Sequence, residues 1–413
     1  MSDARGLSLH FAATHIGKCI LWGAEDLLSL YVMIVLLRIA PPTAGQLFLA
    51  FSLVNASMDL WWGTTLTRRS IKPAMPVAIG IVLACGGLGG LAFVPVGSIA
   101  TTAAALAAFR IGFSLLDVPH NALAAPLAAS HGHLVVARWR TIGTAATALT
   151  LGLAAMPLLA RGAAGGDVLR IVLPGLALVS FALLLPLPRL VDRMLDDPAP
   201  ARIAPPAALP SLAARTPVFC LIQMTGFAAI AVTGRIVLHL HADIRAVVTI
   251  APLLMGGARL AAIWLWSPVA VRVRTTDALL LAYLACAGTI ALLPLALAAG
   301  TTALLGALAL FGLAFGGVLL FAWARLSELA CAGDARGAAR DYGLYTALSK
   351  VGTGISGFVA GDWLAGMPGA IVAVDDLWPL IALLAAVCAV IGLLGARGPE
   401  ARQLATAGGQ HRL

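Results

Sequence analysis

The stretch GFSLLDVPHNALAAPLA, residues 112–128, decides the fold, because it places one carboxylate in an otherwise apolar segment. Asp117 is followed closely by Pro119, His120 and Asn121. An ionised side chain at the middle of a bilayer costs a few kcal/mol or more unless it is paired, hydrated or neutralised. Either this segment lies outside a membrane, or Asp117 has a function inside one.

The composition of the whole chain decides between these alternatives. Of its 413 residues, 61% are hydrophobic and 11% are charged, which leaves too little polar surface for a water-soluble globule of this size. Apolar runs of about 20 residues, long enough to cross a hydrocarbon core of about 30 Å, recur without the alternation of barrel strands. We therefore predict an all-α integral membrane protein with twelve transmembrane helices in two six-helix bundles. The approximate spans are 11–37, 43–66, 74–95, 98–128, 139–160, 168–188, 215–240, 246–269, 278–298, 301–330, 341–366 and 371–396.

The longest polar break, residues 188–210, lies near the middle of the chain and is rich in Pro, Ala and charge, as linkers are. The second and eighth spans both end in a pair of tryptophans and a basic turn, DLWWGTTLTRRS and AIWLWSPVAVRVR. Two halves of matching hydropathy are typical of secondary transporters. The predicted parts are an N-terminal bundle, a cytoplasmic linker, a C-terminal bundle and a cytoplasmic tail, at residues 1–188, 189–212, 213–396 and 397–413.

The net charge of +9 does not indicate a nucleic-acid partner, because the basic residues follow the membrane topology. Seventeen of the 27 lie at the ends of the chain or in the even-numbered connections, and four lie in the odd ones. By the positive-inside rule, both termini are expected in the cytoplasm. The first apolar run is span-length and carries Lys18, Glu25 and Asp26, so we expect no cleavable signal peptide.

Several kinds of site are not expected. The six cysteines lie in or beside apolar segments without a pairable spacing, which indicates free thiols. The histidine pairs 131/133 and 239/241 have a spacing that points two ligands apart on a helix, so no structural metal is predicted. GTGISG, residues 352–357, lies inside an apolar span without the strand that a dinucleotide site needs. No nucleophile with a base appears either, so we expect neither a cofactor nor an enzyme.

Ionisable residues inside the spans are the candidates for function, and helical spacing groups them. Each group lies on one face of its predicted helix. The groups are Arg110, Ser114, Asp117 and Asn121; Asn55 and Asp59; Lys18, Trp22 and Glu25, with Asp26 adjacent; and Thr346, Lys350 and Thr353.

Lys350 is informative because the chain has three lysines against 24 arginines. Burial disfavours the charged forms of a lysine and an aspartate, and pairing restores both charges. Such a pair can exchange partners when a cation or a proton arrives. We therefore expect functional roles for Asp59, Asp117 and Lys350, far from either end of their spans.

Other residues have a plainer alternative. Glu25 or Asp26 could reach the outer interface, and Lys18 and Arg140 could extend to the cytoplasmic one. His120 is expected to line a pocket or to make a hydrogen bond, in preference to relaying protons.

Four segments resemble the glycoside, pentoside and hexuronide cation symporters, the melibiose permease family of the major facilitator superfamily. They are GQLFLAFSLVNASMDLWWGTTL, FSLLDVPHNALAAPLA, ARWRTIGTAATAL and LSELACAGDARGAARDYGLYTALSKVGTGISGFVAGDWLAGMPG. The resemblance implies alternating access, sugar transport by cation-coupled symport, and a multi-pass location in a bacterial inner (plasma) membrane.

The resemblance also implies roles for individual residues. Asp59 matches a cation-site aspartate, with Ser114 where the family has a hydroxyl beside the cation. Asp117 matches the aspartate that binds sugar hydroxyls, and Arg140 matches an arginine near the sugar. Lys350 matches the lysine linked to the cation site, and Lys18 also matches.

The sequence departs from the family at several of these places. Cys19 replaces an acidic residue, and Asn55 replaces one of two aspartates, which favours H⁺ over Na⁺ because Na⁺ prefers several hard oxygens. His120 and Asn121 replace two aromatics. Together with the added Glu25, Asp26 and Arg110, these changes favour a solute other than a simple neutral galactoside, such as a charged sugar derivative, a glycosylated natural product or a zwitterionic metabolite.

We therefore predict a monomeric secondary transporter of a small polar or charged organic solute, in contact with membrane lipid and coupled to H⁺ or Na⁺. A proton-coupled exporter of a drug-like or secreted metabolite is the nearest alternative, followed by a lipid-handling membrane protein. Any Na⁺ would lie among Asp59, Asn55, Ser114 and Asp117. The predicted coupling residues are Asn55, Asp59, Ser114, Asp117 and Lys350, and the predicted substrate-binding residues are Lys18, Trp22, Glu25, Asp26, Arg110, Asp117, His120, Asn121, Arg140 and Thr346.

Overall fold

The computed structural model describes residues 2–68, 71–196, 211–238, 245–330, 335–365 and 374–396, and every regular element in these ranges is a helix. The α-helices are α1 (Ser2–Tyr31), α2 (Pro41–Leu66), α3 (Ala74–Gly90), α4 (Ile99–Ala122), α5 (Ala124–His131), α6 (His133–Arg161), α7 (Gly166–Leu184), α8 (Leu187–Asp196), α9 (Ser211–Leu238), α10 (Arg245–Arg272), α11 (Thr275–Ala299), α12 (Thr301–Ala330), α13 (Ala335–Ala365) and α14 (Val374–Ala396). Three short helices follow α1, α3 and α6, namely the π-helix Val32–Leu36 and the 3-10 helices Leu91–Phe93 and Gly162–Gly165.

The predicted fold class is confirmed, because each of the twelve predicted spans contains a long helix: α1 to α4, α6, α7 and α9 to α14. The chain is a multi-pass membrane protein. In the described ranges, nine stretches qualify as candidate spans by length and hydropathy alone. The helices α2 and α13 are not among them, because polar and small side chains dilute their hydropathy, and these same two helices carry Asp59 and Lys350.

The structure adds a helix where the sequence predicts the linker. The segment around 188 continues as α8, in which Leu187, Leu190, Val191 and Leu195 are buried on one face. Apolar residues at this spacing make an amphipathic helix, which packs against α3 and α1. Residues 197–210 of the predicted linker and the predicted tail, 397–413, lie outside the described residues, and the last two linker residues, 211–212, begin α9. The division into bundles therefore stays a prediction.

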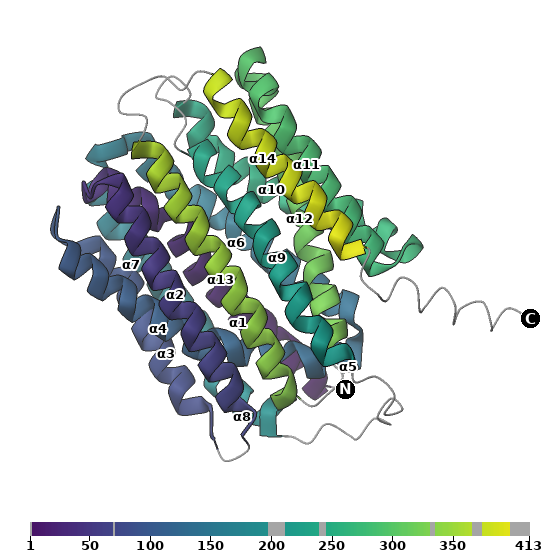
Figure 1. Cartoon of the computed structure of the whole chain (residues 1–413). Helices are drawn as coiled ribbons and strands as arrows, with labels where there is room; N and C mark the ends of the chain where they lie inside the picture. Colours follow the sequence, from purple (N-terminus) through teal and green to yellow (C-terminus); the bar gives the residue numbers. More distant parts are fainter. Residues whose placement is uncertain are drawn as a thin grey trace, which may run out of the picture.

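Small residues let the helices approach closely. The backbone of Gly63 in α2 lies against Ala339 and Gly343 in α13, and Gly152 in α6 lies against Leu253 in α10. In membranes, where apolar side chains gain little by leaving lipid, such backbone contacts supply much of the packing energy. Figure 1 shows α13 running between α2 and α9 through most of the height of the molecule.

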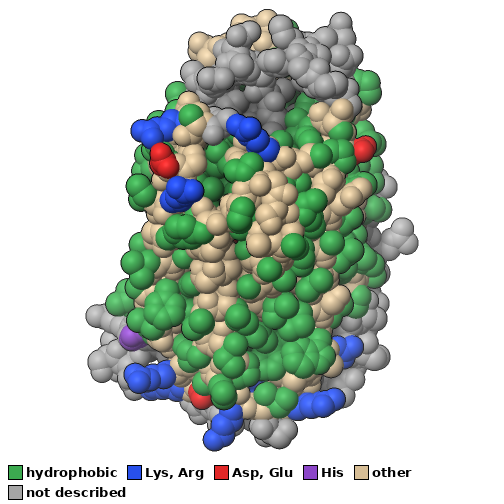
Figure 2. All heavy atoms as spheres, turned by 90° about the vertical axis from the view of Figure 1, so that its left-hand side faces the viewer, with side chains coloured by type: hydrophobic (Ala, Val, Ile, Leu, Met, Phe, Trp, Pro, Cys, Tyr) green, Lys and Arg blue, Asp and Glu red, His purple; other side chains and the backbone are tan. Residues whose placement is uncertain are grey.

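The surface has the pattern that a bilayer requires. Figure 2 shows a belt of apolar side chains without charged groups, between two rims where Lys, Arg, Asp and Glu gather. The exposed apolar side chains of the described residues include Ile171, Leu178 and Trp264. We call the end of the molecule at which α1 begins and α14 ends the inner end, following the predicted orientation, and the other end the outer end.

Two neighbouring glycines of α3 test this packing. A methyl group on Gly87 would lie 2.7 Å from the carbonyl oxygen of Ala105 in α4, whereas one on Gly86 would have no neighbour within 4 Å. We predict that Gly87→Ala destabilises the protein by about 1–3 kcal/mol through overpacking, and that Gly86→Ala leaves it unchanged or stabilises it by up to about 1 kcal/mol. Thermal unfolding in detergent measures both, and equal shifts would contradict the close α3–α4 contact.

Candidate functional site

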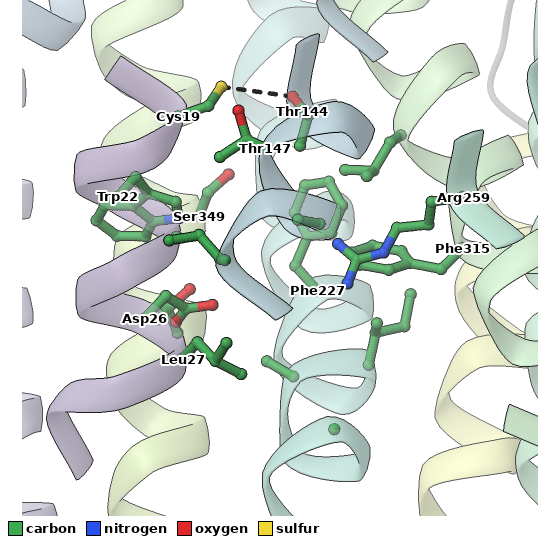
Figure 3. A pocket seen from close by; sticks show the side chains of 18 of the residues that line it. Cys19, Trp22, Asp26, Leu27, Thr144, Thr147, Phe227, Arg259, Phe315 and Ser349 are labelled. Carbon is green, nitrogen blue, oxygen red and sulfur yellow. Dashed lines mark hydrogen bonds between the residues drawn. The ribbon is translucent and has the colours of Figure 1, made fainter. Parts of the chain in front are cut away.

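A cavity of about 340 Å³ lies at the centre of the molecule, between α1, α4 and α6 on one side and α9, α10, α12 and α13 on the other. Its lining includes eight of the residues predicted to form the site. These are Lys18, Trp22, Asp26, Asp117, Asn121, Arg140, Thr346 and Lys350. Figure 3 shows Trp22 and Asp26 of α1 on one wall, with Arg259 and Phe315 facing them from α10 and α12.

The two central lysines and two aspartates form one chain of ion pairs. Lys350 Nζ lies 2.6 Å from Asp59 Oδ2 and 3.0 Å from Asp117 Oδ2, while Lys18 Nζ lies 3.0 Å from Asp117 Oδ1. All four side chains are buried. The chain of pairs joins α1, α2 and α4 to α13, so each charge that enters the membrane is offset by its neighbours.

Asn121 extends this chain into a hydrogen-bonded network. Its Nδ2 donates to Asp117 Oδ1 (2.8 Å), and its Oδ1 accepts from Lys18 Nζ and from Arg140 Nη2, both at 2.6 Å. The guanidinium group of Arg140 also stacks on Trp323 of α12, at 3.7 Å from the ring centre. The amide therefore orients two cations toward one wall of the cavity.

Pro119 frees a backbone acceptor at the same level of α4. Proline has no N–H, so the carbonyl oxygen of Leu115 loses its helical partner. Trp62 Nε1 of α2 donates to that oxygen at 3.2 Å. The backbone opening in the DVP motif is thus satisfied by the neighbouring helix, as burial in an apolar interior requires.

Asn55 and Ser114 lie outside the lining of the cavity. Asn55 Nδ2 donates to the carbonyl oxygen of Arg110, and Ser114 Oγ donates to the carbonyl oxygen of Asn55 at 3.0 Å, so both residues fasten α2 to α4. Within the described part of the chain, Asp59 Oδ1 and Asn55 Oδ1 have no hydrogen-bond partner. The Lys350 ammonium group occupies the position beside Asp59 that the predicted coupling cation would need.

Among the described residues there is no cluster of three or more His, Cys, Asp or Glu side chains able to hold a metal ion. His239 and His241 lie outside them.

The acidic neighbours Glu25 and Asp26 separate into different environments. Glu25 pairs with Arg110 at 2.6 Å, and both side chains are buried away from the cavity. Asp26 lines the cavity and pairs with Arg235 of α9 at 2.6 Å. Consecutive residues point about 100° apart on a helix, which accounts for the difference.

His120 also lies behind the lining of the cavity. Its Nε2 is 3.2 Å from Thr14 Oγ1, and its ring stacks on Phe11 and His15. His15, which the sequence did not single out, does line the cavity.

Two arginines of the C-terminal half, Arg235 and Arg259, belong to the site although the sequence assigned them no role. Their signal was present, because both are basic residues inside predicted spans. The aromatic lining gave no comparable signal, since aromatic side chains in an apolar helix equally face lipid or pack in a core. Besides Trp22, which the sequence predicted, it comprises Phe113, Phe227, Phe311, Phe315, Trp323 and Tyr345.

Comparison with known proteins identifies the fold. The chain matches no family model and no curated protein sequence, so the resemblance to the melibiose permease family rests on the quoted segments. Solved structures of major facilitator superfamily transporters are similar throughout. A mutant of the nucleoside transporter NupG gives a TM-score of 0.63 at 15% identity and covers 94% of this chain and 98% of its own. FucP, in the outward conformation, gives 0.61 at 14% identity, covering 95% and 99%. A bacterial homologue of the iron transporter ferroportin, in an outward-facing state, gives 0.65 at 14% identity, covering 94% and 97%.

The position of Arg110 and Glu25 predicts a structural role for their pair. Breaking a buried pair leaves one charge without a partner, so Arg110→Met and Glu25→Leu should each destabilise the protein by about 3–5 kcal/mol. The double variant should recover most of that loss, because it buries neither charge. Thermal unfolding of the four proteins measures the cycle.

The exposed pair Arg274–Asp277 provides the control, since removing it should cost under about 1 kcal/mol. If the double variant lost as much stability as the two single variants added together, Arg110 and Glu25 would not stabilise each other as a pair.

Proposed function

We propose that this protein is a secondary active transporter that moves a small polar or charged organic solute by alternating access, coupled to a cation, with H⁺ favoured over Na⁺. One observation carries the proposal. Lys350 of α13, on one side of the central cavity, is held by Asp59 and Asp117 of α2 and α4, on the other. The link between the two sides therefore depends on groups that a proton or a cation can neutralise.

The proposed coupling follows from the charges. When Asp117 or Asp59 takes up a proton, Lys350 loses one of its two counter-charges and its hold on α2 and α4 weakens. A solute in the cavity contacts helices from both sides and favours closure around itself. Coupling then means that cation and solute each stabilise the same state.

Contacts at both ends of the molecule support two gates. Toward the outer end, Arg235 of α9 donates to Asp26 of α1. At the inner end, Arg336 of α13 donates to the carbonyl oxygens of Leu66, Arg68 and Ile71, at the end of α2 and beyond it. Alternating access requires that one of these contacts break while the other persists.

We propose a sugar, glycoside or related metabolite as the general class of solute, in keeping with the quoted segments. Export of a drug-like or secreted metabolite would use the same ion pairs, so direction is an outcome of the experiment. A lipid-handling role has no specific observation in its favour. Because the cavity lies within one chain, a monomer suffices for the proposed cycle.

Transport into proteoliposomes tests the proposal, using a solute panel with the pH difference and Na⁺ varied independently. We expect the wild type to accumulate a solute under one of the two gradients. Asp117→Asn should reduce gradient-driven accumulation by about tenfold or more, since it removes a charge on which two lysines depend.

Asp277→Asn, at an exposed pair on the inner side, is the matched control and should transport normally. The central role of Asp117 would be wrong if its variant kept the coupling of the wild type.

Removing the inner contacts should open the cavity from the inner side. Arg336→Ala deletes hydrogen bonds from a charged donor, each of which contributes about 1.5–3 kcal/mol. Cys19 lines the cavity and serves as a native reporter in a chain whose other cysteines are replaced. We predict about fivefold or faster labelling of Cys19 by an impermeant thiol reagent from the inner side.

Arg340→Ala, one turn away and exposed, should not change the labelling rate. Equal rates for Arg336→Ala and the wild type would argue against an inner gate at this residue.

A further inference from the structure

The central cavity holds more positive than negative charge. Five Lys and Arg side chains line it, Lys18, Arg140, Arg235, Arg259 and Lys350, against the acidic Asp26 and Asp117. Asp59, directly behind Lys350, adds one more acid. Lys18, Lys350 and Arg235 are each paired with one of these acids, which leaves two arginines over.

Neither Arg140 nor Arg259 has an acidic partner within 4 Å among the residues that the structure describes. Arg140 is 2% exposed, and no described residue makes a hydrogen bond to its Nε or Nη1. Arg259 likewise has an unpartnered, buried Nε. An uncompensated guanidinium group in an apolar interior costs several kcal/mol, so two of them facing one cavity call for a ligand.

One helix supports both guanidinium groups. Arg140 stacks on Trp323, at 3.7 Å, and Arg259 on Phe315, at 5.1 Å, and both rings belong to α12. Stacking covers the flat face of a guanidinium group and leaves its N–H edge free for an oxyanion. Figure 3 shows the Arg259 guanidinium group directed from α10 into the cavity, beside Phe315.

The two arginines lie on α6 and α10, two lining helices of the cavity that pack against each other. Gly152 of α6 contacts Leu253 of α10, and Gly256 contacts Leu149, so the helices are antiparallel and residue 259 is level with about residue 146. At 1.5 Å per residue, Arg140 lies about 9 Å further toward the inner end. This separation suits one organic anion that reaches between them, with its apolar part against Phe227 and Phe311.

We propose that the transported solute is an organic anion, a carboxylate or a phosphate with an apolar body, and that Arg140 of α6 and Arg259 of α10 bind its charge. This inference rests on the proposed function and names the chemical class of its solute. The anion completes the charge balance of the cavity, and each half contributes one arginine, so an anion in place links the halves directly.

Binding in detergent tests the inference without requiring transport. The probes are phenylpropanoate, phenyl phosphate and a series of aliphatic carboxylates, each paired with its uncharged amide or alcohol and with an amine of the same size. We expect anions to bind more tightly than their matched analogues. Arg259→Gln and Arg140→Gln should each weaken anion binding by about ten- to a hundredfold and leave the amides unchanged. Arg259→Lys should recover part of the affinity.

The unliganded variants separate recognition from a structural role. Removing a partly buried charge that has no acidic partner among the described residues should leave the melting temperature of Arg259→Gln equal to the wild type or higher. Arg274→Gln, at an exposed pair, is the control for an arginine outside the cavity. A lower melting temperature with unchanged anion affinity would overturn the inference, as would a panel in which no anion binds better than its neutral or cationic analogue.

The outcomes also distinguish this inference from the proposed function. Anion binding without gradient-driven transport would overturn the transporter proposal and keep the anion site. Coupled transport of a neutral or cationic solute that is insensitive to Arg259→Gln would keep the transporter proposal and overturn the anion site.

Discussion

The cost of a charge in an apolar interior organises this structure. Lys350 can lie in the middle of α13 because Asp59 and Asp117 accept it, and Asp117 in turn needs Lys18 and Asn121. Each of these side chains fixes the position of a different helix. These ion pairs therefore bring α1, α2, α4 and α13 together at one place. The central cavity lies beside them.

The helices that carry the charges are held by contacts between backbones. Because α2 and α13 are too polar to be recognised as candidate spans, lipid alone gives them less stability than it gives their neighbours. Their glycines let the two backbones approach where Gly63 meets Gly343 and where Gly45 meets Gly357. Close packing and polar content thus occur in the same pair of helices, which also contribute both ends of the Lys350–Asp59 ion pair.

Much of this arrangement could be predicted from the sequence, for a physical reason. A charge inside an apolar run is visible without a structure, and helical spacing indicated that Asp117 and Asn121 share a face. The sequence could not predict which way each side chain points, or which residue of another helix it pairs with. Glu25 and Asp26 are adjacent in sequence, but one meets Arg110 and the other Arg235. Arg259 was visible as a basic residue inside a predicted span, but only the packed helices reveal that it has no acidic partner among the described residues.

The bonds between α2 and α4 end on backbone atoms. Trp62, Asn55 and Ser114 donate to carbonyl oxygens of Leu115, Arg110 and Asn55, so substituting the side chains of the accepting residues leaves the acceptors in place. These bonds tie Asp59 of α2 and Asp117 of α4 to one pair of joined helices. In the proposed cycle, the pair keeps the spacing of the two carboxylates constant, and the charge at this frame changes only when a proton or a cation arrives or leaves.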